Sequence, residues 1–200
     1  MEQQSSTFQD ILSSVRELQA RLDKLEKENV ELKGIIKSNN KNNKFLQNIM
    51  ERSAPSIEYN DWIEYLLNNV EFYLNTVFES DLISGIESLL KDSFDKFETL
   101  PVIAFHRKPN IFYYYSKDGN WILLDNSEFT KLIGRIEYRF LLQFNTDWYQ
   151  PNIQNIKKSE EYRNKYDSYY LKILGGNRVS NEVRHNRIQQ YFYKLIRERA

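Results

Sequence analysis

Hydrophobic residues recur at alternating spacings of three and four positions along the first quarter of the chain. With Leu22 at the first heptad position, this repeat runs from Phe8 to Ile36 and is broken only by Asn29. A helix packed on its own core uses a wider stripe with a period of 3.6 residues, whereas a strict 3.5-residue period indicates helices that supercoil on one another. We therefore predict a coiled-coil helix over residues 1–50. Its seam consists of Phe8, Ile11, Val15, Leu18, Leu22, Leu25, Asn29, Leu32 and Ile36.

Asn29 and the charges beside the seam predict the orientation of the helices. A buried Asn at this heptad position bonds to its counterpart only when the chains are parallel and in register. In that arrangement Arg21 faces Glu26 of the partner helix and Glu28 faces Lys33, and both pairs attract. We predict a parallel homodimer, with a parallel trimer as the alternative because "RLDKLE" resembles the signature of short parallel trimers. A solitary amphipathic helix folded back on its own chain is the competing interpretation.

The seam decays after Ile36 in the asparagine-rich stretch "KSNNKNNKF". Asparagine is a poor residue for a helix interior because its amide competes for backbone hydrogen bonds. The segment 51–59 contains Pro55 and is predicted to be a linker, with Asn60 as the N-cap of the next helix. A globular domain is therefore expected over residues 60–200.

The pattern of this domain predicts the element order ααβββααα, an α+β fold with a small antiparallel meander. Two helices come first, because hydrophobic residues follow the helical period from Trp62 to Val77 and from Leu82 to Phe97. After the meander, a helix capped by Asn126 is expected to end near Trp148, before Pro151. A tyrosine-rich helix ending at Gly175-Gly176 and a last helix starting near Ser180 complete the domain.

Two turns are predicted between the strands of "PVIAFHRKPNIFYYYSKDGNWILLDN". Pro109-Asn110 fits the first turn, and Asp118-Gly119 is typical of a two-residue type I′ hairpin loop. That loop places Tyr115 opposite Ile122 and leaves apolar residues on both faces of the hairpin. The sheet is therefore either covered by helices on both sides or exposes an aromatic face to bases or to a protein partner.

The same stretch, followed by the amphipathic segment "SEFTKLIGRIEYRFLLQF", resembles the C-terminal module of uncharacterised coiled-coil proteins of nucleocytoplasmic large DNA viruses. The resemblance covers roughly residues 60–200 and implies an α+β module that follows a coiled coil. In that family a short zinc finger or DNA-binding module often precedes it. This chain has no cysteine, so DNA binding through a zinc finger is not supported here.

The composition excludes several kinds of chemistry. Without cysteine there are no disulfides, thiolate metal sites or cysteine nucleophiles. No Walker loop, dinucleotide-binding fingerprint or metal-binding motif occurs, and neither His106 nor His185 has a recognisable catalytic partner in sequence. We therefore predict no catalytic residues, no metal and no cofactor. The paired carboxylates Asp92 and Asp95 are interpreted as solubilising charges on a helix.

The first ten residues show no basic segment followed by an apolar run, and no apolar run is long enough for a membrane span. We therefore expect an intracellular, soluble protein without a membrane partner. If it is viral, the host cytoplasm, the viral factory or the virion is the expected location.

The zero net charge hides an asymmetry, because residues 51–100 carry eleven acidic and three basic side chains while residues 151–200 carry eleven basic and five acidic ones. These two regions either face each other within the domain or leave a basic surface for nucleic acid. The basic side chains form two helical ridges, which are candidate nucleic-acid-binding surfaces. The first consists of Lys131, Arg135 and Arg139, and the second of Arg187, Lys194 and Arg197.

The sequence thus favours a non-enzymatic oligomeric interaction or structural protein of viral type, in which a parallel coiled coil clusters copies of an α+β domain. Its partners are expected to be further copies of the chain and a protein that the sequence does not identify. The alternative is a nucleic-acid-binding protein that uses the two ridges and the aromatic hairpin. An enzyme with a scattered site is a third hypothesis.

Overall fold

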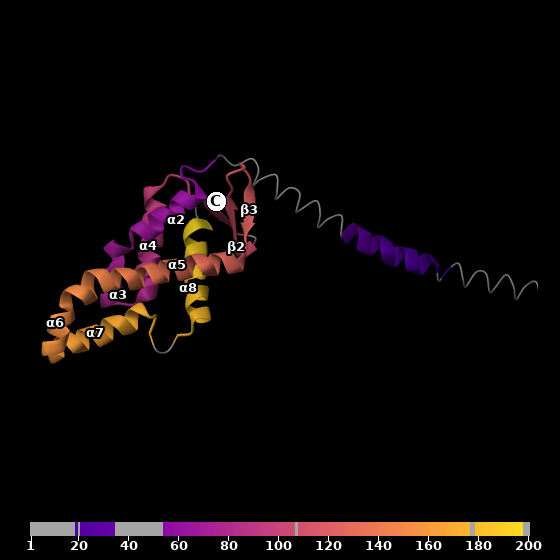
Figure 1. The fold of residues 1–200 in the computed structure, drawn as a ribbon. Helices are drawn as coiled ribbons and strands as arrows, with labels where there is room; N and C mark the ends of the chain where they lie inside the picture. The colour runs from indigo at the N-terminus through magenta and orange to yellow at the C-terminus, as the bar shows by residue number, and fades with distance from the viewer. Residues whose placement is uncertain (1–18, 20, 35–53, 107, 177–178, 198–200) are drawn as a thin grey trace, which may run out of the picture. The chain divides into compact units, whose positions relative to one another are not determined.

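A computed structural model of the chain describes residues 19, 21–34, 54–106, 108–176 and 179–197. The chain divides into two units, residues 1–52 and 53–200. In the first unit, residues 21–34 form a helix. The second unit is a mostly helical α+β domain with a small antiparallel sheet, as predicted (Figure 1).

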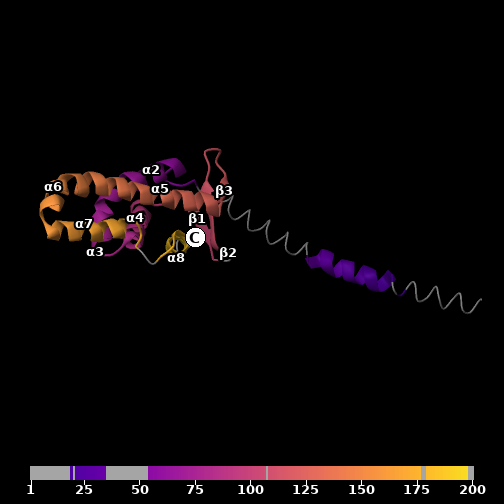
Figure 2. The same cartoon turned by 60° about the horizontal axis from the view of Figure 1, so that its bottom comes forward.

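The domain begins with α2 (Tyr59–Asn68), the 3-10 helix η1 (Val70–Tyr73), α3 (Leu74–Glu79) and α4 (Leu82–Lys96). The strands β1 (Val102–Phe105), β2 (Lys108–Tyr115) and β3 (Trp121–Leu124) follow. The chain then forms α5 (Asn126–Phe144), the π-helix η2 (Asn145–Tyr149), α6 (Gln150–Lys158), α7 (Glu160–Ile173) and α8 (Asn181–Arg197). The sheet lies at one end of the domain and the α6–α7 connection at the other, with α5 running between them (Figure 2).

A cluster of aromatic rings forms the centre of the core. Phe192 of α8 packs against Trp62 of α2 at 5.8 Å between ring centroids, and against Phe112 of β2 at 5.6 Å. Phe129 of α5 stacks on Phe112 at 5.1 Å. All four rings are buried. Helix α8 thus holds α2 and the sheet together. Full burial of such side chains contributes roughly 1.5–3 kcal/mol each to the stability of the fold.

The first predicted helix of the domain is divided in the structure. Asn69 ends α2 with a non-helical backbone, and its side-chain Nδ2 donates to the carbonyl of Tyr65 at 2.7 Å. The amide thereby competes for the backbone in the way that makes asparagine a poor residue inside helices. The predicted cap was also wrong, because Asn60 lies inside α2 and Glu58 precedes the helix.

The boundary between linker and domain is marked by Ser56. Its Oγ donates to the carbonyl of Thr99 at 2.9 Å, and its backbone N–H donates to Thr99 Oγ1 at 2.8 Å. These bonds fix the chain before α2 to the segment that joins α4 to β1, so this part of the expected linker 51–59 is attached to the domain.

The prediction that a helix ends before Pro151 was wrong. The chain continues from α5 through η2 into α6, and Pro151 lies in the first turn of α6. Proline lacks an N–H and crowds the carbonyl four residues earlier, so it breaks a regular α-helix. Here the turn before it is a π-helix, in which the N–H of Gln150 bonds to Asn145, five residues back. The wider turn lets the helix pass the proline, so α6 is an element that the predicted order lacks. The cap of α5 also differs by one residue, because Asp125 rather than Asn126 accepts the N–H of Ser127 at 3.2 Å.

The register of the β2–β3 hairpin differs from the prediction by one residue. Tyr115 pairs with Trp121 rather than Ile122, and Ser116 donates its N–H to the carbonyl of Asn120 at 2.8 Å. A type I′ turn needs positive φ at both central residues, but in this loop only Gly119 has one, at 77°. The hairpin therefore closes through the three residues 117–119, with glycine in the left-handed position.

The first turn of the sheet was also placed wrongly. Phe105 pairs with Lys108, so the turn comes before Pro109, and Pro109 and Asn110 lie within β2. The pairing shifts between Ala104 and Phe105, and Asn110 has φ 58°. These residues form a bulge, a position in a strand that accommodates both a proline and a left-handed asparagine.

Candidate functional site

The predicted seam is exposed along the helix of residues 21–34. Leu22, Leu25 and Leu32 are 58%, 64% and 57% exposed, and Asn29 is exposed beside them. All of residues 21–34 are exposed in this chain. The remaining predicted seam residues lie outside the described residues: Phe8, Ile11, Val15, Leu18 and Ile36. Among the described residues of the first unit, this part of the seam is therefore an exposed apolar helix face.

The charges predicted to flank this face are exposed as well. Glu26, Glu28 and Lys33 lie on the solvent-accessible surface of the helix. Lys24 approaches Glu28 to 3.9 Å on the same helix, and both side chains remain largely exposed. Pairs of this kind contribute only a few tenths of a kcal/mol, so Glu28 keeps the capacity to bind a cation on a second helix.

The three residues of the first basic ridge differ in exposure and in contacts. Arg139 is half-buried, and its Nε donates to the carbonyl of Leu67 at 3.2 Å, in the last turn of α2. Lys131 and Arg135 are exposed on α5. A cation at the end of a helix binds carbonyls that have no helical partner and opposes the negative end of the helix dipole. Arg139 thus joins α5 to α2.

Lys172, which the sequence did not single out, plays the same part for α3. Its Nζ donates to the carbonyls of Phe78 at 2.6 Å and Glu79 at 3.3 Å, at the end of that helix. No sequence signal distinguishes Lys172 from other surface lysines, because its acceptors lie more than ninety residues away.

The second basic ridge faces acidic side chains of α4. Arg187 and Lys194 line an open groove of about 320 Å³ together with Asp81 and Glu87. Burial and then the charge of Asp81 raise the pKa of Glu87, and Lys194 opposes this shift. Arg197, the third residue of the ridge, places its guanidinium 5.4 Å from the centre of the Tyr193 ring. This arrangement matches the interpretation in which the basic C-terminal region faces the acidic region 51–100.

The aromatic hairpin is largely built into the core. Phe112 and Tyr113 are buried, and Tyr114 packs on Tyr59 at 4.6 Å between ring centroids. Exposed apolar side chains occur instead on β3, where Ile122 is 42% and Leu123 54% exposed. Ile111 of β2 is also 37% exposed, so the most exposed apolar part of the hairpin is the aliphatic strand β3 at the margin of the sheet.

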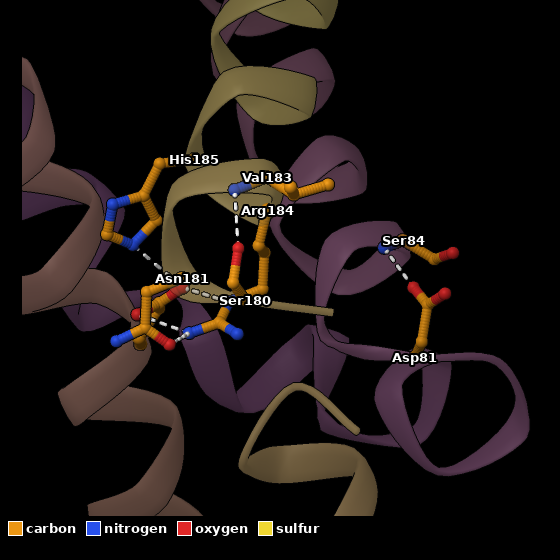
Figure 3. A network of polar contacts seen from close by, with 8 residues as sticks. Asp81, Ser84, Ser180, Asn181, Val183, Arg184 and His185 are labelled. Atoms are coloured by element: carbon orange, nitrogen blue, oxygen red, sulfur yellow. Dashed lines mark hydrogen bonds and ion pairs between the residues drawn. The ribbon is translucent and has the colours of Figure 1, made fainter. Parts of the chain in front are cut away.

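A buried ion pair between Arg184 and Glu137 joins α8 to α5. Figure 3 shows Arg184 beside Asn181 and His185 at the start of α8. Arg184 is only 4% exposed. Its Nε donates to Glu137 Oε1 at 2.6 Å, while its Nη2 donates to Glu137 Oε2 at 3.2 Å and to Asn181 Oδ1 at 3.0 Å. His185 Nε2 lies 3.3 Å from the same Oε1 of Glu137. A two-pronged pair of this kind fixes the angle between the two helices.

Arg184 also explains the glycine that follows α7. A Cβ on Gly175 would lie 2.3 Å from Arg184 Nη1, and Gly175 has φ 87°, so both space and backbone conformation require glycine here. No sequence motif marks this cluster. The available signal was an arginine on the inner stripe of α8, one turn before Ile188, where an apolar residue is expected.

Asp92 is exposed on α4, as a solubilising charge would be, and it also accepts a hydrogen bond from the hydroxyl of Tyr65 at 2.5 Å. Burial and the bond to Asp92 raise the pKa of Tyr65, and burial and Asp92 raise the pKa of Tyr73 to about 12. A second hollow of about 460 Å³ is lined by Tyr59, whose pKa burial raises to about 12. These hydroxyls keep their protons near neutral pH, which disfavours them as bases or nucleophiles.

Among the residues that the structure describes, no group of three His, Cys, Asp or Glu side chains is arranged to bind a metal ion. Within the same residues no helix is long and apolar enough to cross a membrane. His106 follows β1 and is exposed.

Comparison of the chain with protein-family models, with curated proteins and with solved structures found no significant match.

Proposed function

We propose that this protein is a non-enzymatic oligomeric interaction or structural protein, in which a parallel coiled coil clusters copies of the α+β domain. One observation supports the proposal: the leucines of the strict repeat in residues 21–34 lie exposed along one face of their helix. An exposed row of leucines is unfavourable in water, and a second helix with the same seam covers it by knobs-into-holes packing.

Asn29 and the flanking charges support the parallel, in-register arrangement. The polar amide at this position bonds to its counterpart only in that register, and Glu28 then faces Lys33 of the partner helix. The dimer is the preferred assembly and the trimer its alternative. Clustering raises the effective concentration of the attached domains, so that weak contacts made by each domain act together.

The non-enzymatic part of the proposal has support from the polar clusters of the domain. Glu137 and Arg184 satisfy each other, and Asp92 binds Tyr65. Nucleic-acid binding has less support than self-association. Of the six predicted cations, Arg139 binds a helix end, Arg187 and Lys194 lie beside carboxylates, and Arg197 lies over a ring.

The test compares two substitutions on the same helix. Leu32 lies on the seam, whereas Val30 is an equally apolar residue, 70% exposed, on the opposite side of the repeat. Light scattering of the full chain should give two or three times 24.1 kDa. Leu32→Asp should reduce this to the monomer mass because it places a carboxylate in the seam, and Val30→Asp should leave the mass unchanged. A monomeric parent chain at micromolar concentration would refute the proposal.

A further inference from the structure

Strand β3 forms an edge of the sheet, whose order is β1-β2-β3. In an antiparallel pair, backbone groups point alternately toward and away from the neighbouring strand. Ser116 bonds to Asn120, and the next strand residue, Tyr115, donates to Pro101 on the β1 side at 2.9 Å. Its partner Trp121, and Leu123 two residues later, therefore direct their N–H and C=O groups away from β2. These groups make the outer edge of β3 a template for a further strand.

The two edges of this sheet differ in how far they are protected. On β1, Val102, Ile103 and Ala104 are buried, and the hydroxyl of Tyr193 in α8 donates to the carbonyl of Phe105 at 3.3 Å. A bulge also interrupts the pairing of β1 with β2. Strand β3, "WILL", carries no charge and no proline, and its pairing with β2 is continuous. Edges of soluble proteins are normally blunted by such features, and an apolar edge without them is a site for strand addition.

We infer that β3 is a second self-association site, at which the β3 strands of two copies pair antiparallel. Identical edges related by a twofold axis meet in this direction. In β3 only Trp121 and Leu123 have backbone groups that point outward. The register with the most hydrogen bonds therefore places Ile122 of one copy opposite Ile122 of the other, and Trp121 of each copy opposite Leu123 of the other. The nearest charged residue after the strand, Asp125, then falls opposite Gly119, so no like charges meet.

The occupant is a second copy because the edge is too short to hold a free partner. Stable interfaces bury about 1,200–2,000 Å² in total, far more than one four-residue strand provides. The proposed coiled coil supplies further copies of β3 at an effective concentration in the millimolar range, where a weak contact forms. The inference therefore rests on the proposed function, and its test must separate the two.

The chain contains no cysteine, so a single introduced thiol reports one contact. Ile122→Cys in the full chain places two thiols at a non-hydrogen-bonded pair, where the Cα atoms are about 4.5 Å apart and a disulfide fits. The matched control is Tyr138→Cys, which is 61% exposed on α5. In a glutathione redox buffer, Ile122→Cys should form covalent dimer at least about tenfold faster than the control. Equal rates would overturn the inference.

A second substitution tests whether the strand backbone makes the contact. Leu123→Pro in the Ile122→Cys chain removes an outward N–H but none of the bonds between β3 and β2. Cross-linking should fall to the level of the control. Where this variant does not fold, Leu123→Lys places a charge on the edge and should have the same effect. Cross-linking that survives both substitutions contradicts strand pairing.

The mass of the reduced Ile122→Cys chain separates the two hypotheses. An oligomeric mass with control-level cross-linking refutes the β3 contact and leaves the coiled coil standing. A monomeric mass refutes the coiled coil, and fast cross-linking in that monomer would still support the β3 contact. Adding Leu32→Asp should lower both the mass and the cross-linking rate, because the coil supplies the local concentration.

Discussion

The helix of residues 21–34 and helix α5 are both amphipathic, but their apolar stripes differ in width and in period. On α5 one broad face with a period of 3.6 residues is buried, and it consists of Phe129, Leu132, Ile133, Ile136, Phe140 and Phe144. The leucines of the first helix form a narrow seam with a period of 3.5, and they are exposed. By the general rules of helix packing, a broad face with a period of 3.6 residues suits a globular core, whereas a narrow seam with a period of 3.5 residues suits a second helix.

The largest effect is expected when one apolar side chain on each of the two helices is shortened to alanine. Phe140→Ala should lower the free energy of unfolding of the domain by about 3–5 kcal/mol, because Phe140 is fully buried and a cavity remains. Leu25→Ala should leave that transition unchanged and weaken self-association instead, since Leu25 is 64% exposed within the chain. Urea unfolding followed by tryptophan fluorescence measures the domain alone, because all three tryptophans lie in it. Equal losses in the two variants would contradict the distinction.

A smaller effect is expected at Asn29, which in the proposed coiled coil lowers stability and specifies the register. Asn29→Leu should raise the stability of the assembled helices by about 1–3 kcal/mol, the cost of burying an incompletely satisfied amide. It should also loosen the choice between two and three strands, so that light scattering detects a mixture. The loss of helical circular dichroism with temperature measures the gain. An unchanged melting temperature with a single mass would show that Asn29 lies outside the seam.

Sequence periodicity predicted the α+β class because each stripe is a local property of one segment. The inner faces of α4, α5 and α8 follow from the 3.6-residue spacing alone. The cap at Ser180 is also local, and its Oγ accepts the N–H of Val183 at 3.3 Å.

The details that failed depend on backbone angles or on distant partners. Asp118-Gly119 suits either a two- or a three-residue loop, and the choice depends on the φ angle of Asp118, which the residue type does not determine. Pro151 usually ends a helix, and only the π-turn before it allows α6. The pair Arg184–Glu137 spans 47 residues and is a tertiary contact, so no local pattern identifies Glu137.

The smallest effect concerns charge within the domain. Glu87 lies in the groove between α4 and α8, and burial followed by the charge of Asp81 raises its pKa. A carboxyl whose pKa is higher in the folded than in the unfolded state binds its proton more tightly when folded. Its contribution therefore favours the folded state at low pH and is lost as the pH rises from the ordinary carboxyl range through the raised value.

Glu87→Gln removes this penalty, because the amide is neutral at every pH. The melting temperature of the variant should exceed that of the parent slightly at about pH 7, and the difference should vanish at about pH 3.5, where Glu87 is protonated in both states. Thermal unfolding of both chains across this range measures the difference, with the exposed Glu71→Gln as control. A pH-independent difference would show that Glu87 acts through packing rather than charge. In that case the domain would cover its apolar side chains without shifting the pKa of its charged ones. The difference between the two helices would then concern apolar side chains only.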